Sequence, residues 1–120
     1  VTLAQLFSTG ITVEGYPTEH LRAQLAARGC WSTADVRRAA QGQRVTVAGI
    51  VTHRQRPSTS QGITFINLED EFGMLNIVCT RGLIRRFSPH ALTRSAIAVT
   101  GLIQRAGSVI SLYAHSLVPL

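Results

Sequence analysis

The order of strands and turns between residues 49 and 79 most constrains the fold of this chain. Apolar and β-branched residues alternate from Arg44 and continue past Gly49, a pattern that predicts one long strand with a glycine at its centre. After a polar loop, two more strands are predicted at Ile63–Glu69 and Met74–Cys79, with a short acidic turn between them. A glycine inside a long strand favours a bulge or a sharp bend, which lets a single strand take part in both halves of a small barrel.

The rest of the chain completes a five-stranded pattern. After a short helix predicted at Gly82–Phe87, a fourth strand is expected at Ser95–Gln104 and a fifth at Val109–Leu117, with a glycine turn at Ala106–Ser108 joining them. Three strands, a helix and two strands is the order of the OB-fold, a small barrel whose second and third strands commonly hold single-stranded nucleic acid. The predicted fold class is therefore mainly β: a five-stranded Greek-key OB-fold barrel preceded by a short N-terminal helical segment.

The first 43 residues have a helical pattern. A helix is predicted to begin at Pro17–Glu19, to carry Leu21, Leu25 and Ala26 on one face, and to end at Gly29. A second short helix is predicted to begin at Ser32, with Asp35 at the capping-box position. These patterns predict two parts, a helical lead-in at 1–43 and an OB-fold domain at 44–120. Since the first residue is a valine and not a methionine, we expect the chain to be a piece of a longer or processed polypeptide.

The charge of the chain favours a polyanionic partner. Twelve arginines and no lysines stand against six acidic residues, which gives a formal net charge of +6 at pH 7. No apolar run approaches the roughly 18 residues of a membrane span, and Cys30 and Cys79 lack the spacing of zinc ligands. Neither a phosphate-binding loop, a dinucleotide fingerprint nor a hydrolytic triad is recognisable. We therefore expect no cofactor, no metal and no membrane, and a reducing cytoplasmic location.

Strand alternation places Phe65 on the outer face of the predicted second strand. Phe65, Asn67 and Glu69 share one face, whereas Ile66 and Leu68 share the other. Two aliphatic residues on one side identify the core face, so the aromatic ring is expected outside, where it can stack on a nucleic-acid base. The alternative is a bulge that turns Phe65 into the core.

The predicted third strand adds Met74, Asn76 and Val78 to the same outer face. The Asn76 amide can donate and accept hydrogen bonds with a base edge or a phosphate, and the two apolar residues suit a contact surface. The alternative interpretation of Asn76 is a polar residue that only faces solvent.

Three arginines are expected to border this face. Arg54 and Arg56 lie in the loop after the first strand, and Arg105 lies in the hairpin between the fourth and fifth. In an OB-fold these two loops flank the binding face, so the three guanidiniums are expected to converge on phosphates. For each arginine taken singly, a solvated loop charge is the alternative. The candidate nucleic-acid-binding residues are Arg54, Arg56, Phe65, Asn67, Met74, Asn76 and Arg105.

The acidic run Glu69–Glu71 raises the question of a metal site. The turn offers few further oxygen ligands, and Phe72 interrupts the run. We therefore predict that Asp70 caps the turn through hydrogen bonds to the local backbone.

A series of motifs extends over nearly the whole chain. Its members are Thr9–Ile11, Tyr16–Arg22, Val47–Val51, Arg54–Pro57, Gly62–Phe65, Leu68–Glu71, Gly73 and Asn76. The series resembles the C-terminal OB-fold region of the bacterial DnaE-type replicative DNA polymerases, and most of all the error-prone, damage-inducible branch of that family. One position departs from the resemblance, because the family often carries a small polar residue where Phe72 stands.

The resemblance implies a domain that binds single-stranded template DNA within an error-prone translesion DNA polymerase, active in damage-induced mutagenesis and DNA repair. The parent protein would be a DNA-directed DNA polymerase, whereas this fragment has no counterpart of the family's palm-domain aspartates and so no catalytic residues. The implied partners are single-stranded DNA, the other domains of the parent polymerase and, less directly, mutasome proteins and the sliding clamp.

Two alternatives stay open. One is a protein-interaction module in which Phe65, Met74 and Val78 anchor a partner. The other is an RNA-binding barrel of the anticodon type, since class II aminoacyl-tRNA synthetases carry a similar strand and acidic turn.

Overall fold

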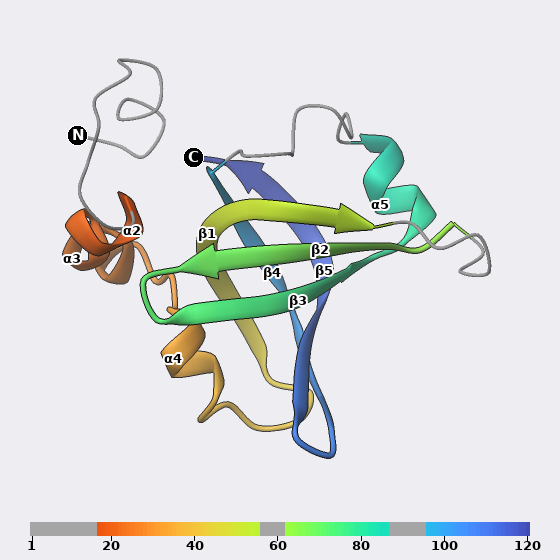
Figure 1. The fold of residues 1–120 in the computed structure, drawn as a ribbon, viewed down its shortest axis with the longest axis horizontal. Helices are drawn as coiled ribbons and strands as arrows, with labels where there is room; N and C mark the ends of the chain where they lie inside the picture. Colours follow the sequence, from red (N-terminus) through yellow and green to blue (C-terminus); the bar gives the residue numbers. More distant parts are fainter. Residues whose placement is uncertain (1–16, 56–61, 87–95) are drawn as a thin grey trace.

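The computed structural model of the chain describes residues 17–55, 62–86 and 96–120. Its five strands form a closed barrel in the order β1-β2-β3-β5-β4 (Figure 1). The strands are β1 (Arg44–Gln55), β2 (Thr64–Asp70), β3 (Gly73–Cys79), β4 (Ala96–Ala106) and β5 (Val109–Pro119). The helices are α2 (Pro17–His20), α3 (Arg22–Ala27), α4 (Thr33–Val36) and α5 (Arg81–Arg86). None of these described helices is long and apolar enough to cross a membrane. The predicted five-stranded OB-fold barrel with helices before it is confirmed.

One parallel pair and one long strand close the barrel. β3 runs parallel to β5, with Asn76 beside Ser111, whereas the other neighbouring strands are antiparallel. The first half of β1 pairs with β4 and its second half with β2, and Ile50 has partners on both sides. The prediction that one long strand belongs to both halves of the barrel is confirmed.

The bulge in β1 lies beyond the glycine. The β1–β2 register shifts between Val51 and His53, so the extra residue is Thr52 and not Gly49. Gly49 has a different role, because a Cβ there would lie 2.8 Å from the carbonyl oxygen of Glu69. The expected bulge at the glycine is therefore wrong in position. The shift at Thr52 also changes which residues near the end of β1 face outward.

Aliphatic side chains fill the barrel interior and alternate with the outward residues of each strand. The largest fully buried side chains among the described residues are Val36, Val47, Val51, Ile66, Leu68, Ile77, Ile97, Val99, Ile103, Leu112 and Leu117. Val36 comes from α4, and the buried Leu83 comes from α5 on another side of the barrel (Figure 1). Full burial of such a side chain stabilises the folded chain by about 1.5–3 kcal/mol.

The lead-in packs on the barrel through a second, smaller apolar cluster. Leu21, Leu25 and Cys30 are buried there against Ala48 and Ala96. The single helix predicted before Gly29 is instead divided at Leu21, whose φ of −111° and ψ of 10° lie outside the helical range. The outcome is two short helices, α2 and α3, on either side of Leu21. Leu21 and Leu25 are both buried, whereas Ala26, which was predicted on the same face, is exposed.

The predicted capping box at the start of α4 is confirmed. The Ser32 hydroxyl accepts from the N–H of Asp35 at 3.1 Å, and the Asp35 carboxylate accepts from the N–H of Ser32 at 3.0 Å. Just before this cap, the N–H of Trp31 donates to the carbonyl of Thr46 at 2.6 Å, and Trp31 forms an isolated parallel bridge with Val47. The lead-in is thus hydrogen-bonded to β1 directly before α4 begins.

Candidate nucleic-acid interface

Three rows of side chains cross the outer side of the sheet that contains β2, β3 and β5. Directly paired residues on neighbouring strands share a face, so the register fixes the members of each row. The aromatic row is Gln55, Phe65, Val78 and Tyr113; the polar row is His53, Asn67, Asn76 and Ser111; the third row is Ile50, Glu69 and Met74. These three rows are called the outer face below.

The aromatic row has an exposed ring at two of its positions. Phe65 is 37% exposed and Tyr113 is 45% exposed, and Val78 lies between them on β3. Neighbouring strands lie about 4.8 Å apart, so the two rings stand roughly 10 Å apart. Ile66, next to Phe65, is fully buried, so the predicted outward orientation of Phe65 is confirmed. Val78 shares that orientation but is only 7% exposed, so it is not the exposed anchor that we expected.

The polar row lies next to the aromatic row. It brings together two amides, an imidazole and a hydroxyl, from Asn67, Asn76, His53 and Ser111. Asn76 is exposed and Asn67 is half-buried. Met74, in the third row, is 56% exposed. The structure therefore brings Phe65, Asn67, Met74 and Asn76 onto one surface, as expected, and their contact with nucleic acid stays a prediction.

Arg54 does not lie on this surface. The bulge at Thr52 pairs Arg54 with Ile66, a core residue, so the arginine shares the inner side of the sheet near the end of β1. His53 and Gln55 take the outward positions instead. Arg56, the other arginine expected here, lies outside the described residues.

Arg105 lies near the opposite end of β1 from Arg54. Its Nε donates to the carbonyl of Ala39 at 2.9 Å and its Nη2 donates to the carbonyl of Arg37. Its backbone lies beyond Leu102, the partner of Arg44 at the first residue of β1. The expected convergence of Arg105 with Arg54 is therefore wrong, because the register separates the two arginines along the whole length of one strand.

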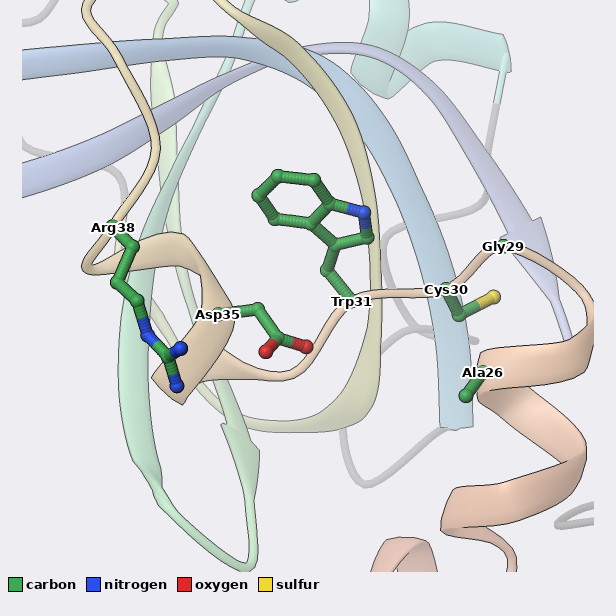
Figure 2. Close-up of a pocket in the computed structure, with 6 residues that line it drawn as sticks. All are labelled: Ala26, Gly29, Cys30, Trp31, Asp35 and Arg38. Carbon is green, nitrogen blue, oxygen red and sulfur yellow. The ribbon is translucent and has the colours of Figure 1, made fainter.

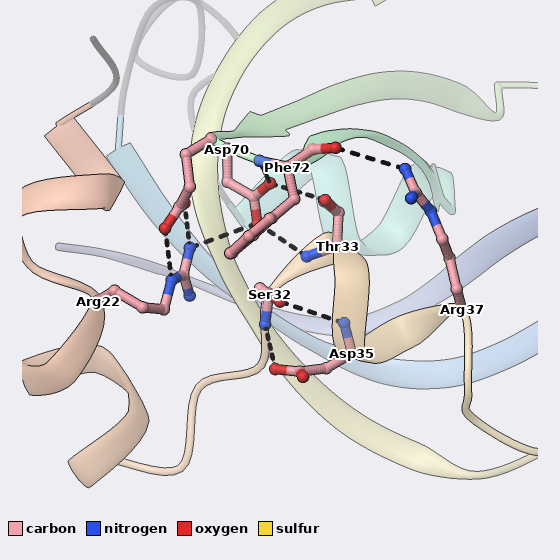
Figure 3. A network of polar contacts seen from close by, with 8 residues as sticks. Arg22, Ser32, Thr33, Asp35, Arg37, Asp70 and Phe72 are labelled. Atoms are coloured by element: carbon pink, nitrogen blue, oxygen red, sulfur yellow. Dashed lines mark hydrogen bonds and ion pairs between the residues drawn. The ribbon is translucent and has the colours of Figure 1, made fainter.

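The acidic turn between β2 and β3 is hydrogen-bonded to the lead-in (Figure 3). Asp70 is buried, and its carboxylate accepts from the N–H and the hydroxyl of Thr33, both at 2.7 Å, and from the N–H of Phe72 at 2.9 Å. The predicted turn cap by Asp70 is confirmed by the Phe72 contact. Within the described ranges, no group of three or more His, Cys, Asp or Glu side chains could hold a metal ion.

Arg22 joins the lead-in to the same turn. Its guanidinium forms a bidentate pair with Glu71 and lies 5.8 Å from the centroid of the Phe72 ring. The hydrogen bond to Glu71, against the opposing effect of burial, raises the pKa of Arg22. Burial raises the pKa of the Glu71 carboxyl, but hydrogen bonds from Arg22 and the backbone outweigh it, so that pKa lies below its ordinary value. Phe72 thus stacks on a residue of its own chain.

Two shallow hollows of about 430 Å³ each lie beside these elements. Figure 2 shows the first, in which Asp35 and Arg38 lie on one side of Trp31 and Ala26 and Cys30 on the other. The first hollow belongs to the lead-in and is separate from the outer face. The second hollow lies next to Tyr113 along β5, and its lining residues are Thr80, Gly82, Leu83, Ala114 and His115.

Three residues of this region were not among the candidates selected from the sequence. Tyr113 alternates with the buried Leu112 and Ala114, a signal that could have placed it outside. His53 faces outward only because of the bulge at Thr52, which local alternation does not reveal. The attachment of Arg22 to the turn had no local signal at all.

A closed OB-fold barrel with aromatic and polar side chains on one sheet face defines a protein of the nucleic-acid-binding OB class. The family model described as "OB-fold nucleic acid binding domain" matches residues 45–120, and the chain belongs to this family. The chain is also similar to one region of the bacterial error-prone DNA polymerases, as its motifs indicated. It is 45% identical over 112 residues to the error-prone DNA polymerase of Mycobacterium tuberculosis (strain ATCC 25618 / H37Rv), covering 93% of this chain and 10% of that protein. It is 42% identical over 114 residues to the error-prone DNA polymerase of Pseudomonas fluorescens, covering 95% of this chain and 11% of that protein.

The chain thus spans about a tenth of the length of the curated relatives it matches. Among solved structures, asparaginyl-tRNA synthetase from Pyrococcus horikoshii matches with a TM-score of 0.62 at 18% identity, over 76% of this chain and 23% of that one. The OBody AM1L10, bound to hen egg-white lysozyme, matches with a TM-score of 0.62 at 13% identity, over 77% of this chain and 93% of the OBody chain. These structural matches show the OB-fold alone.

Proposed function

We propose that this chain is the single-stranded-DNA-binding domain of an error-prone DNA polymerase and that it holds template near the catalytic part of that protein. The observation that carries the proposal is the pair of exposed rings, Phe65 and Tyr113, in one row of the outer face. Bases stack on such rings with little regard to sequence, each stack contributing about 1–3 kcal/mol. A polymerase needs this tolerance, because its template has any sequence.

The polar row supports the same proposal. Asn67, Asn76, His53 and Ser111 present donors and acceptors directly beside the rings, within reach of the edge or phosphate of a stacked nucleotide. Damage-induced mutagenesis, lesion bypass and contacts with mutasome proteins or the sliding clamp are implied by the resemblance of the sequence motifs alone, and they belong to this proposal.

Titration of the chain with fluorescent single-stranded DNA at two salt concentrations tests the proposal. Phe65→Ala and Tyr113→Ala should each weaken binding by about 1–3 kcal/mol. Phe65→Leu, which keeps apolar area but removes the ring, should lose nearly as much. Val118→Ala removes an exposed apolar side chain near the end of β5, outside the three rows of the outer face, and is the matched control. Wild-type affinity in both ring variants would refute the proposal.

A protein-interaction module is the second candidate. Met74 and Val109 are each more than half exposed at one end of the outer face, which favours an apolar contact there. The OBody structure shows that another barrel of this shape binds a protein. Absence of DNA binding at both salt concentrations would favour this candidate. An RNA oligonucleotide of the same sequence, titrated in parallel, tests the anticodon-type alternative.

A further inference from the structure

The second hollow opens where the pairing between β3 and β5 ends. Val78 and Tyr113, the last paired residues of these two strands, belong to the aromatic row. Beyond them β3 gives way to α5, and the hollow lies between α5 and β5. Its volume of about 430 Å³ is within the range of about 300–1,000 Å³ that is typical of small-molecule sites. The hollow therefore adjoins the aromatic row at its Tyr113 end.

His115, which lines this hollow, faces outward as Tyr113 does. Both residues are exposed, whereas Ala114 between them is buried. The register between β4 and β5 shifts here, and His115 is the extra residue of the resulting bulge. Its imidazole has no hydrogen-bonding partner among the residues that the structure describes. The ring is therefore available to a ligand in the hollow.

The lining suits a nucleobase better than a phosphate. Leu83 and Ala114 supply buried apolar surface. Thr80 Oγ1 accepts from the N–H of Leu83 at 3.4 Å, which leaves its hydroxyl proton free to donate to a base edge. None of the described lining residues is an arginine. The guanidinium of Arg81 lies toward β2, on the other side of β3 from β5, because a Cβ on Gly62 would collide with it.

We infer that this hollow binds one base of the single strand, next to the nucleotide that stacks on Tyr113. The inference rests on the proposed function, and it adds a site that a base enters to the two rings on which bases stack. His115 and Thr80 would hydrogen-bond to the edge of that base. His115 is two residues beyond Tyr113 on β5, a distance of about 6.6 Å, so the ring and the hollow suit neighbouring nucleotides.

A variant that fills the hollow tests the inference. Gly82→Leu places a side chain there, and no other element of the fold lies within 4 Å of the added Cβ. Leucine also favours a helix over glycine, so the melting temperature should not fall. The affinity for fluorescent oligothymidine should fall about 10-fold, the order expected for one lost base contact. The salt dependence should be unchanged, because no phosphate contact is lost.

Ala27→Leu is the matched control for this variant. It places the same side chain at an exposed position of another short helix, α3, and should bind as the wild type does. His115→Ala is the second test variant. It removes the imidazole from the hollow, and it decides the question if Gly82→Leu does not fold.

Single abasic positions test whether a base occupies the hollow. The shortest oligothymidine with full affinity is used, so that it binds in one register. One abasic position should weaken binding to the wild type about 10-fold but should not weaken binding to Gly82→Leu, because the filled hollow no longer takes that base. His115→Ala should reduce the loss at the same position. Phe65→Ala should abolish the loss at a different position.

The outcomes separate this inference from the proposed function. If Phe65→Ala weakens binding but Gly82→Leu binds as well as Ala27→Leu, the hollow is not part of the binding site, and the proposed function stands without it. If every abasic oligomer loses the same factor in Gly82→Leu as in the wild type, no base enters the hollow and the inference is wrong. If the wild type binds no oligomer, the proposed function and this inference both fall.

Discussion

The guanidinium of Arg22 binds the carboxylate of Glu71 through two parallel hydrogen bonds, although 49 residues separate them in the sequence. Nε donates to Oε2 at 2.8 Å and Nη2 donates to Oε1 at 2.5 Å, while Nη2 also lies 3.4 Å from Oδ2 of the buried Asp70. This pair fastens the start of α3 to the turn that joins the two central strands of the outer face.

Removing Arg22 should destabilise the folded chain. Arg22→Ala deletes the bidentate pair and one neighbour of the buried Asp70 carboxylate, and we expect a loss of about 1–2 kcal/mol in the free energy of unfolding by urea. The side chain of Arg22 is 22% exposed, which keeps the effect moderate. Arg28→Ala, at the exposed C-terminal end of the same helix, should change the free energy of unfolding by less than about 0.5 kcal/mol. Equal effects would show that the pair contributes nothing.

Stability should fall in acid partly through Glu71. The pKa of Glu71 in the folded chain lies below its ordinary value of 4.5, so its contribution is fully present above that value. The contribution is lost as the pH falls through the lower folded pKa, because the unfolded chain then binds the proton more readily. Urea midpoints measured from pH 7 to pH 3 should therefore decline less steeply in Glu71→Gln than in the wild type. Parallel curves would contradict this assignment.

Gly101 should not tolerate a side chain. A Cβ there would lie 2.0 Å from the carbonyl oxygen of Tyr113, within the β4–β5 pairing that follows the register shift after Thr100. Gly101→Ala should therefore cost about 1–3 kcal/mol of folding stability. Gly82→Ala is the control, because no atom lies within 4 Å of its added Cβ and alanine favours the helix α5 by roughly 0.5–1 kcal/mol. Thermal unfolding of the two variants should give shifts of opposite sign.

Substitutions of the neighbouring residues Phe65 and Ile66 should affect different properties, nucleic-acid affinity for Phe65 and folding stability for Ile66. Phe65 is 37% exposed and Ile66 is fully buried on the opposite side of β2. Ile66→Ala should leave a cavity and cost about 2–5 kcal/mol, whereas Phe65→Ala should unfold near the wild-type temperature and lose only nucleic-acid affinity. A large drop in the melting temperature of Phe65→Ala would move its ring from a binding role to a structural one.

Local patterns in the sequence were enough to predict the barrel and part of its outer face. Alternation along β2 placed Phe65 and Asn67 outside because successive side chains of a strand point to opposite faces, whatever the strand packs against. The capping box of Ser32 and Asp35 was equally predictable, since its two hydrogen bonds join residues three positions apart. These features depend only on the backbone within a few residues.

The tertiary structure decided which side chains meet. Because of the bulge at Thr52, His53 and not Arg54 faces outward on the outer face. The parallel pairing of β3 with β5 brings Tyr113 into one row with Phe65. The closure of the barrel also separates Arg54 from Arg105. It brings the turn that carries Glu71 within reach of Arg22. Such contacts depend on strand register, which is fixed by the packing of the whole core, so no window of neighbouring residues contains them.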